Sequence, residues 1–286
     1  MKEIPYSRMR RPRAIYILII SLCILVAVLV FLRRIPPRHA VEGFATIPRI
    51  IWSYWHDPQI PPKVKQILDD RREVLSGWEH RVLNETTVYD YIPRDEFPKG
   101  YETLGQQHKA DWIRLYLLKI YAGCWMDASI IVNRSTEIEE LYEESLLRKS
   151  QLTGYSIGNS SYIETFLLMA PMKSTVISPW FDEYTSAIEY GFAPYKKKVS
   201  SKVDLSQCFS GEDDTYLITT AALLYTLQVI LPEEPPMVLK HRDESMLKYH
   251  VECNNDNKCV VEKIRNTPKH LQPPNLKLTR FNREFL

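Results

Sequence analysis

The sequence predicts an α/β domain with a mainly parallel central sheet, preceded by one membrane-spanning helix. From residue 47 onward, short strand-forming segments alternate with longer segments of helical periodicity, which is typical of a parallel sheet covered by helices. Residues 14–32 contain no charged side chain. The composition, 45% hydrophobic and 25% charged with a net charge of +2, is that of an ordinary globular chain. We therefore expect a single folded domain over residues 47–286.

The uncharged N-terminal segment is long enough to cross a bilayer. As a helix, residues 14–32 extend about 28 Å, roughly the thickness of a bilayer core. Arginines flank both ends, and their slight excess before the segment favours a cytosolic N-terminus. We expect a cytosolic tail over residues 1–13, a single-pass type II anchor and a stem over residues 33–46. A cleaved signal peptide is the alternative, although arginines stand where small residues should mark cleavage. The flanking arginines also oppose a buried core helix.

This topology would put the rest of the chain in a lumen or outside the cell. Cys253 and Cys259 bracket a turn-rich loop that could bring the two thiols to disulfide distance. Cys124 and Cys208 could pair, or could simply be small buried residues. Three triplets fit the pattern of glycosylation acceptors, at Asn84, Asn133 and Asn159.

The first predicted elements rest on turn signals and apolar spacing. Residues 47–55 form a buried strand that ends at a His-Asp-Pro turn. Pro61 and Pro62 open a helix that reaches about Ser76, since proline is favoured in a first helical turn. Its inner face carries Val64, Ile67, Leu68 and Val74. A second strand over residues 79–83 and a short helix over residues 86–92 follow.

The centre of the chain predicts an amphipathic helix followed directly by a strand. Apolar residues recur at helical spacing from residue 108 to residue 121, and Gly123 fits a helix terminator. Residues 125–132 have strand character, which the polar triplet Asp127-Ala128-Ser129 interrupts. We expect the carboxylate of Asp127 to lie within this strand.

The remaining elements continue the alternation. We expect helices over residues 137–147, 179–190 and 216–229, and a strand over residues 161–169. The tail from Pro232 is predicted to be irregular, with a hairpin around residues 253–259. Because ligands bind beyond the carboxyl ends of parallel strands, the end of the first strand and Asp127 should meet at one edge of the sheet.

Asp127 is the most informative side chain, because a buried carboxylate costs several kcal/mol (order of magnitude) unless it is paired or bound to a cation. Asp127 and Ser129 share one strand face, and their oxygens could hold Mg²⁺ or Mn²⁺ together with substrate phosphates. A simple turn or capping aspartate is the alternative. Asp111 and Arg114 lie three residues apart on one helical face. They could bind a ligand, or could form an exposed ion pair that contributes little.

Other candidates have strong structural alternatives. Trp52 and Trp55 could stack on a base or a sugar, although aromatic residues at strand ends are more often core. His108 could cap the central helix or touch a ligand. Three acidic residues cluster at a predicted helix N-terminus, where the helix dipole alone favours them. These are Glu212, Asp213 and Asp214.

Four segments, residues 47–55, 108–114, 125–129 and 277–279, together resemble the capsular polysaccharide synthesis family of glycosyltransferases. The resemblance covers roughly residues 47 to 280. That family is similar to the sugar-transferring "DxD" group, which includes yeast initiating mannosyltransferases and the large clostridial glucosylating toxins. The resemblance implies a GT-A fold, a nucleotide-sugar donor, a divalent metal and retention of anomeric configuration.

The resemblance also implies roles for individual residues. Asp127 matches the first Asp of the DxD motif, which faces the donor and the metal. Ser129 stands at the second Asp, the direct metal ligand, so Mn²⁺ or Mg²⁺ would have one charge fewer to hold it. Asp111 would accept hydrogen bonds from sugar hydroxyls, and the planar fork of Arg114 would steady the sugar or the diphosphate.

The same resemblance implies further donor contacts. Trp52 matches the first-strand position, and the cation of Lys277 would stabilise the leaving diphosphate. His108 is a weaker donor-binding candidate. Independently of the resemblance, one acid of the cluster Glu212, Asp213 and Asp214 could meet the acceptor or stabilise the transition state.

We therefore expect a membrane-anchored enzyme of the Golgi lumen that transfers a hexose from UDP or GDP to a glycan, lipid-linked sugar or glycoprotein. No basic stripe recurs outside the first forty residues, which argues against nucleic-acid binding. A glycoside hydrolase is one alternative, with Asp127 facing Glu212 or Asp213 as its two carboxylates. A catalytically impaired glycan-binding membrane protein is the other, because the second acid of the motif is missing.

Overall fold

The computed structural model describes residues 46–157, 162–206, 208, 209, 211, 214–231, 233–279 and 282. The predicted tail, the anchor and nearly all of the predicted stem lie outside these residues. Within them, no helix is both long and apolar enough to cross a membrane. Residues 45–286 form one compact unit.

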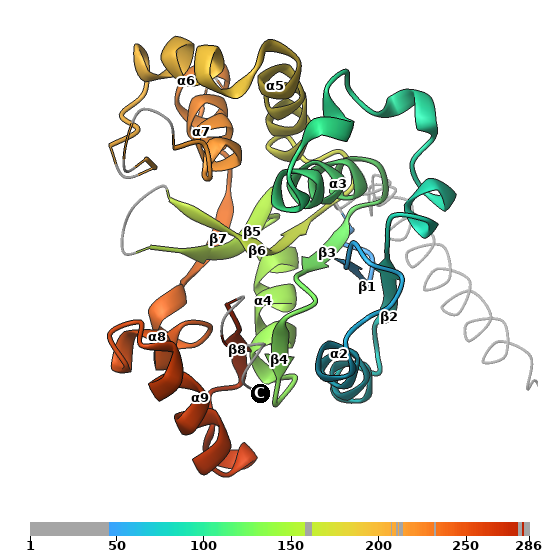
Figure 1. The fold of residues 1–286 in the computed structure, drawn as a ribbon, viewed down its shortest axis with the longest axis vertical. Helices are drawn as coiled ribbons and strands as arrows, with labels where there is room; N and C mark the ends of the chain where they lie inside the picture. The colour runs from blue at the N-terminus through green and yellow to red at the C-terminus, as the bar shows by residue number, and fades with distance from the viewer. Residues whose placement is uncertain are drawn as a thin grey trace, which may run out of the picture. The chain divides into compact units, whose positions relative to one another are not determined.

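A six-stranded sheet with the order β2-β1-β3-β6-β5-β7 forms the centre of this unit (Figure 1). β6 runs antiparallel to both of its neighbours, while β2, β1, β3, β5 and β7 run in one common direction. The predicted mainly parallel α/β sheet is thus confirmed. The strand bounds are Glu79–Leu83 (β2), Ile50–Tyr54 (β1), Gly123–Met126 (β3), Ile163–Ala170 (β6), Leu152–Ser156 (β5) and Met237–His241 (β7).

Helices cover both faces of the sheet, and alternation along the strands decides which side chain meets which helix. Trp52, Trp125 and Leu168 join the larger core beneath α3, α5, α6 and α7. Ile51 and Cys124 point the other way, into a second core with α4. Figure 1 shows these two helical layers on either side of the sheet. Their bounds are Gln106–Tyr121 (α3), Ile177–Tyr190 (α5), Phe192–Ser200 (α6), Ile218–Tyr225 (α7) and Thr136–Leu147 (α4).

A tight reversal connects α3 to β3 and fixes the central motif in space. α3 ends at Tyr121, and Gly123 takes a φ of 97°. A Cβ at Gly123 would lie 2.8 Å from the carbonyl oxygen of Ile50 on the neighbouring strand. Only glycine combines this backbone conformation with so close an approach. The chain therefore enters β3 directly after α3, which brings the helix face that carries Asp111 and Arg114 near the end of β3.

The predicted strand over residues 125–132 is wrong in one respect, because it is two strands. β3 ends at Met126, and β4 (Ile130–Val132) belongs to a separate two-stranded sheet with β8 (Asn275–Lys277). Asp127 to Ser129 form the turn between them. The Ile130 amide donates to the Asp127 carbonyl at 3.1 Å and closes this turn, so the chain leaves the sheet despite the strand-forming residues on either side.

The C-terminal segment is also more regular than predicted. α8 (Lys248–Glu252) and α9 (Asn257–Asn266) replace the expected hairpin. Cys253 and Cys259, the predicted pair, form a disulfide between these helices. The Asp256 side chain accepts a hydrogen bond from the Cys259 amide and caps α9. The helix therefore begins between the two cysteines, where a loop is predicted. Cys124 and Cys208 are buried and do not pair with each other.

The other helical elements agree with the predicted positions or are short. α2 (Pro62–Val74) packs Val64 and Leu68 against Ala128 of the motif turn. α7 continues into a π-helical turn, so the helical segment ends at Ile230, one residue beyond the predicted helix over residues 216–229. Short 3₁₀ helices connect the longer elements, at Thr87–Asp90 (η1), Arg94–Glu96 (η2), Tyr101–Thr103 (η3), Arg242–Glu244 (η5) and Lys269–Leu271 (η6); Thr226–Ile230 (η4) is the π turn.

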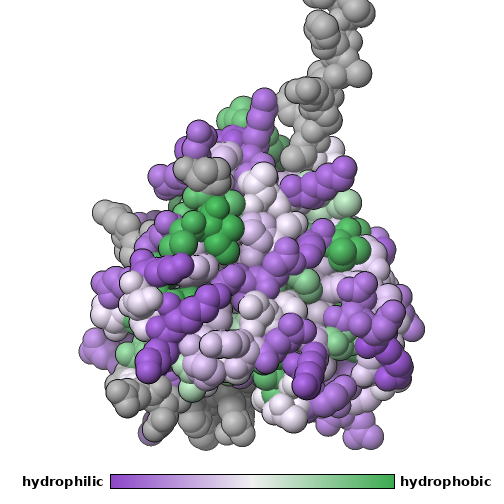
Figure 2. Space-filling view, turned by 90° about the horizontal axis from the view of Figure 1, so that it is seen from above, coloured by the Kyte–Doolittle hydropathy of each residue, from purple (hydrophilic) through white to green (hydrophobic). Residues whose placement is uncertain are grey.

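The face seen from above is mostly hydrophilic (Figure 2). Hydrophobic side chains appear on it as small, separate patches. Scattered exposed apolar residues of this kind are normal on protein surfaces. The surface in this view therefore gives no sign of a large apolar docking face.

Candidate active site

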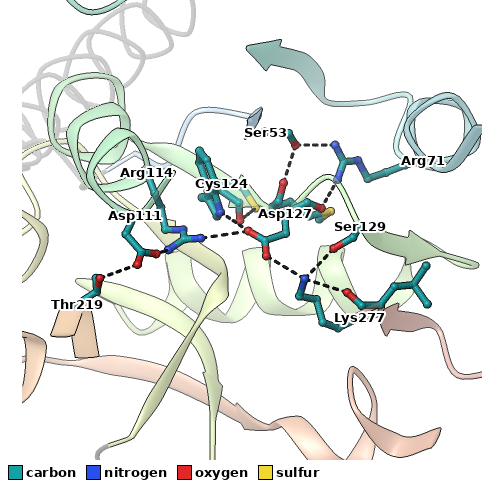
Figure 3. A network of polar contacts seen from close by, with 12 residues as sticks. Ser53, Arg71, Asp111, Arg114, Cys124, Asp127, Ser129, Thr219 and Lys277 are labelled. Atoms are coloured by element: carbon teal, nitrogen blue, oxygen red, sulfur yellow. Dashed lines mark hydrogen bonds and ion pairs between the residues drawn. The ribbon is translucent and has the colours of Figure 1, made fainter. Parts of the chain in front are cut away.

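Asp127 lies directly after β3 at the carboxyl edge of the parallel strands, and it is the centre of a polar network (Figure 3). Its Oδ1 accepts hydrogen bonds from Trp125 Nε1 at 2.9 Å and from Arg114 at 3.2 Å. Its Oδ2 lies 3.0 Å from Nζ of Lys277. The Asp127 side chain is 24% exposed, so it remains open to the solvent side of the network.

The surrounding charges keep Asp127 ionised. Burial alone would raise its pKa, but Lys277, Arg114 and the Trp125 indole together hold the pKa of this carboxyl below its usual value. Asp127 is therefore a carboxylate at neutral pH.

Arg114 joins the two acids of the predicted motif. Its guanidinium donates to Asp111 Oδ1 and to Asp127 Oδ1, and it lies 4.8 Å from the ring centroid of Trp125. The second oxygen of Asp111 accepts a hydrogen bond from Thr219 Oγ1 on α7 at 2.7 Å. Asp111 and Arg114 are 3% and 4% exposed, so the alternative of an exposed ion pair is wrong. Both residues belong to the buried base of the site.

Lys277 reaches the motif from the far end of the chain. β8 pairs antiparallel with β4, with Lys277 opposite Ile130. From this position its ammonium donates to Ser129 Oγ at 2.7 Å and to the Leu278 carbonyl at 3.2 Å, in addition to Asp127. The structure thus brings together Asp111, Arg114, Asp127, Ser129 and Lys277, as the sequence predicts.

Arg71 of α2 was not predicted and lies beneath the motif turn. One guanidinium nitrogen donates to Ser53 Oγ at 2.7 Å and the other to the Asp127 carbonyl at 3.2 Å. Ser53 in turn donates to the Met126 carbonyl at 2.6 Å. Complete burial lowers the pKa of Arg71 to about 10, which still leaves it charged at neutral pH. Its position on the apolar face of α2, one turn beyond Leu68, is the signal that could have found it.

We tested whether these residues fit the divalent cation that the family resemblance implies. The oxygens in question are Asp127 Oδ2 and Ser129 Oγ, and Lys277 Nζ lies between them at hydrogen-bonding distance from both. Across the described part of the chain, no three His, Cys, Asp or Glu side chains gather as a metal site would require. As arranged, the oxygens of Asp127 and Ser129 bind an ammonium group and do not form a site for Mn²⁺ or Mg²⁺.

The prediction that Trp52 binds the donor is wrong. Its side chain is fully buried and donates from Nε1 to the Ala122 carbonyl at 2.9 Å, so neither ring face can stack on a ligand. Trp55 lies just beyond the end of β1 and packs against the small cluster formed by Val64, Leu68 and Ala128. Of the two tryptophans, Trp55 is the one near the sheet edge.

His108 packs inside the helical layer. Its ring contacts Phe192 and lies 3.3 Å from the Tyr184 hydroxyl, and burial lowers its pKa. Asp214 forms a turn in which its carboxylate accepts a hydrogen bond from the Tyr216 amide. Glu212 and Asp213 lie outside the described residues.

The structure describes two of the three predicted glycosylation acceptors. Asn133 donates from Nδ2 to the Pro273 carbonyl at 2.9 Å and to Gln272, so a glycan on this nitrogen would break contacts with the C-terminal segment. Glycosylation of Asn133 stays a prediction. Asn84 Oδ1 accepts hydrogen bonds from the amides of Thr86 and Thr87 at the start of η1, and its glycosylation stays a prediction. Asn159 lies outside the described residues.

A cavity of about 950 Å³ lies beside the carboxyl ends of β5 and β7. Ser156 and His241 line it from these strands, and Glu137 lines it from α4. Glu137 is buried and accepts a hydrogen bond from Asn275 Nδ2 at 2.6 Å. Asn275 belongs to β8, the strand that also carries Lys277, so the cavity and the Asp127 network share a structural element.

At the carboxyl edge of this α/β sheet, Asp111 and Asp127 both pair with Arg114, and Asp127 also pairs with Lys277. Residues 39–188, just over half of the chain, match the model of the capsular polysaccharide synthesis protein family. The chain therefore belongs to this family, and the predicted family is confirmed. The narrower likeness to yeast mannosyltransferases stays a prediction.

Two curated relatives are fungal O-glycosyltransferases. PaGT from Phomopsis amygdali is 26% identical over 144 residues, which cover 46% of this chain and 33% of the relative. BraB from Annulohypoxylon truncatum is 30% identical over 115 residues, which cover 35% of this chain and 26% of the relative. The chain thus spans about a third or less of the length of the relatives it matches.

Two solved structures are similar to this chain at low identity. A glycosyltransferase involved in the glycosylation of the major capsid of PBCV-1 is 13% identical with a TM-score of 0.42, covering 83% of this chain and 98% of that one. The glycosyltransferase GlyE of Streptococcus pneumoniae TIGR4 is 13% identical with a TM-score of 0.40, covering 82% of this chain and 55% of that one.

Proposed function

We propose that this chain is a glycosyltransferase with a GT-A-like fold that moves a hexose from a nucleoside diphosphate to a hydroxyl group. The observation that carries the proposal is the position of Arg114 and Lys277 on either side of Asp127 at the carboxyl edge of the sheet. Two cations that meet at a partly open point form a site for the diphosphate of a donor. Family membership and the names of the fungal relatives support the same class.

The difficult part of this reaction is charge separation. As the bond between the anomeric carbon and the diphosphate oxygen breaks, the diphosphate takes the electron pair and positive charge develops on the sugar. Arg114 and Lys277 stabilise the leaving group electrostatically. The acceptor hydroxyl oxygen forms the new bond on the same face of the sugar, and its proton passes to the departing diphosphate oxygen. This course retains the anomeric configuration without a protein nucleophile.

We assign Asp111 a different role from the one the family resemblance implies. Its two oxygens already bind Arg114 and Thr219, and the side chain is almost fully buried. A carboxylate in this position holds the guanidinium in place and leaves the sugar hydroxyls to groups nearer the opening. Asp111 is therefore a positioning residue for Arg114, and Asp127 is the acid that faces the donor.

We further propose a type II arrangement, in which residues 14–32 anchor the chain and the folded domain lies in a Golgi-like lumen. The uncharged N-terminal segment supports the anchor. The Cys253–Cys259 disulfide supports an oxidising compartment. The acceptor would be a glycan, a lipid-linked sugar or a glycoprotein, and the cavity beside β5 and β7 is a candidate for part of its binding surface.

The purified full chain should be screened against UDP- and GDP-hexoses, with release of the nucleoside diphosphate as the readout. At least one donor should be turned over, and Asp127→Asn should abolish that turnover. Asp182→Asn is the matched control, because Asp182 forms an exposed pair with Lys119 on the helical layer. This control should behave like the wild type.

Two other results would contradict the proposal. Hydrolysis of an aryl glycoside without any nucleotide would identify the glycosidase alternative instead. Sugar binding without turnover, identical in wild type and Asp127→Asn, would identify a binding protein.

A further inference from the structure

We propose that the ammonium group of Lys277 takes the place of the divalent cation, so that the donor diphosphate is bound and cleaved without a metal. This inference rests on the proposed function and concerns the same site. It assigns Ser129 and Lys277 as a matched pair that replaces a second carboxylate and its metal ion.

The first argument is geometric. Lys277 Nζ lies 3.0 Å from Asp127 Oδ2 and 2.7 Å from Ser129 Oγ, which are the two oxygens that a metal bound by this motif would need. Its third hydrogen bond goes to the Leu278 carbonyl at 3.2 Å. An ammonium group has three donors, and here each of them meets an oxygen. The position of the cation is therefore already filled by the protein.

The second argument is the balance of charge. Arg114 and Lys277 contact the two carboxylates Asp111 and Asp127, and a third cation, Arg71, donates to the main-chain carbonyl of Asp127. Both oxygens of Asp127 are already bonded to positively charged groups. A divalent ion entering here would meet like charge at close range, whereas a diphosphate would meet the one uncompensated positive charge of the network.

The third argument is that Lys277 is held in place. Its amide donates to the Met246 carbonyl at 2.9 Å, and its carbonyl is paired with His250 Nε2 at 3.0 Å. The Leu278 amide donates to the Ser129 carbonyl at 3.1 Å, which ties the end of β8 to the motif turn itself. Such preorganisation is what electrostatic stabilisation of a leaving group requires.

Serine at position 129 agrees with an ammonium group in place of the metal ion. A second Asp would add a negative charge that attracts a divalent cation, whereas the hydroxyl of Ser129 is a neutral acceptor for the ammonium group. When a donor arrives, the N–H directed to the Leu278 carbonyl, the longest of the three bonds, can turn to a phosphate oxygen. Asp127 and Ser129 would keep the ammonium group in position during that exchange.

The test uses the purified full chain with the donor found in the screen. Turnover should be unchanged by excess EDTA and by added Mn²⁺. Lys277→Met, which keeps most of the apolar stem, should lower kcat by about 100-fold, as removal of one preorganised charge-stabilising group does. Lys65→Met is the matched control, since Lys65 pairs with Asp69 on the surface of α2. It should leave turnover unchanged, and thermal unfolding should show both variants folded.

A second variant reverses the exchange. Ser129→Asp combined with Lys277→Ala restores two carboxylates and removes the ammonium group. This variant should bind Mn²⁺, as measured by electron paramagnetic resonance of the titrated ion, and its turnover should depend on Mn²⁺. The wild type should bind no Mn²⁺ in the absence of UDP, and with UDP it should bind no more than UDP alone does.

The outcomes separate this inference from the proposed function. Loss of wild-type turnover in EDTA with recovery on Mn²⁺ would overturn the metal-free site and leave the transferase intact. Failure of every donor would count against the transferase. The Mn²⁺ titration would still decide the present inference, because binding by the wild type overturns it and binding by the double variant alone supports it.

Discussion

Two carboxylates meet the short strand β8, and they are satisfied in opposite ways. Asp127 contacts cations, Arg114 and Lys277, and keeps part of its surface open. Glu137 is 7% exposed and is held by neutral donors, the hydroxyl of Ser245 and the amide of Asn275. The same strand thus carries one residue for each acid.

The difference separates binding from positioning. Lys277 can turn one N–H toward an anionic ligand, and the negative charge of Asp127 keeps Lys277 and Arg114 in place until the ligand arrives. The neutral donors around Glu137 are used up inside the protein, where they fix β8 against α4. One network is therefore arranged to receive a ligand, and the other holds the strand that supplies Lys277.

The largest effect on stability should come from breaking the charged network. Arg114→Met would leave Asp111 buried with only Thr219 as a partner. An uncompensated buried charge costs about 3–5 kcal/mol, which should appear as a lower free energy of unfolding in urea. Lys119→Met on the same helix removes an exposed ion pair with Asp182 and should cost less than about 1 kcal/mol. Equal losses of unfolding free energy in the two variants would mean that breaking the Arg114 network destabilises the protein no more than breaking an exposed ion pair.

Removing the neutral contacts of Glu137 should lower the free energy of unfolding by less, but it should also reduce turnover. Glu137→Gln puts an amide donor beside the Asn275 amide and should lower the free energy of unfolding by about 1–3 kcal/mol. Because β8 would then be held less firmly, turnover should fall through poorer positioning of Lys277. Glu144→Gln is the control, since Glu144 of the same helix forms a surface pair with Arg148. A loss of stability in Glu137→Gln with unchanged turnover would show that β8 positions Lys277 without this anchor.

A smaller change should sharpen the assignment of the Asp127 side. Ser129→Ala removes one of the three oxygens around Lys277 but leaves the ion pair with Asp127. We expect a loss of about 1 kcal/mol in the free energy of unfolding. The reduction in turnover should be smaller than in Lys277→Met. Turnover as low as in that variant would mean that the hydroxyl itself contacts the donor.

The sequence predicts those helices and strands whose apolar pattern lies within one short segment of the chain. The helices that became α2, α3, α4 and α5 and the strands that became β1 and β2 follow from apolar spacing and proline or glycine at their ends. β5, β7, β8 and α6 were missed. β8 has only three residues, and its pairing with β4 joins positions more than a hundred residues apart, which no local window contains.

The site shows the same division. Helical spacing and the resemblance identified Asp111 and Arg114, and the resemblance alone pointed to Lys277, whose place depends on the β4–β8 pairing. Trp52 was misassigned because a strand points alternate residues to opposite faces, and its face is the one covered by α3. Arg71 was overlooked although a charged residue on an apolar helix face is itself a signal of a buried partner.

The smallest expected effect is a change of stability with pH. It distinguishes the contact of Lys277 with His250 from its contact with Asp127. His250 pairs with the Lys277 carbonyl, and burial lowers its pKa below the usual 6.5. The unfolded chain therefore takes up this proton first as the pH falls, so the contribution of His250 to stability is present above 6.5 and is lost below it. The pKa of Asp127 is lowered from 3.8, so its ion pairs persist to more acidic pH. Urea unfolding between about pH 7 and pH 5 should show a gradual loss that is shallower in His250→Gln, while the Asp127 network stays charged. Because His108 and His80 also have lowered pKa values, the loss should shrink without vanishing. A slope identical to that of the wild type would mean that His250 does not couple proton uptake to the support of Lys277.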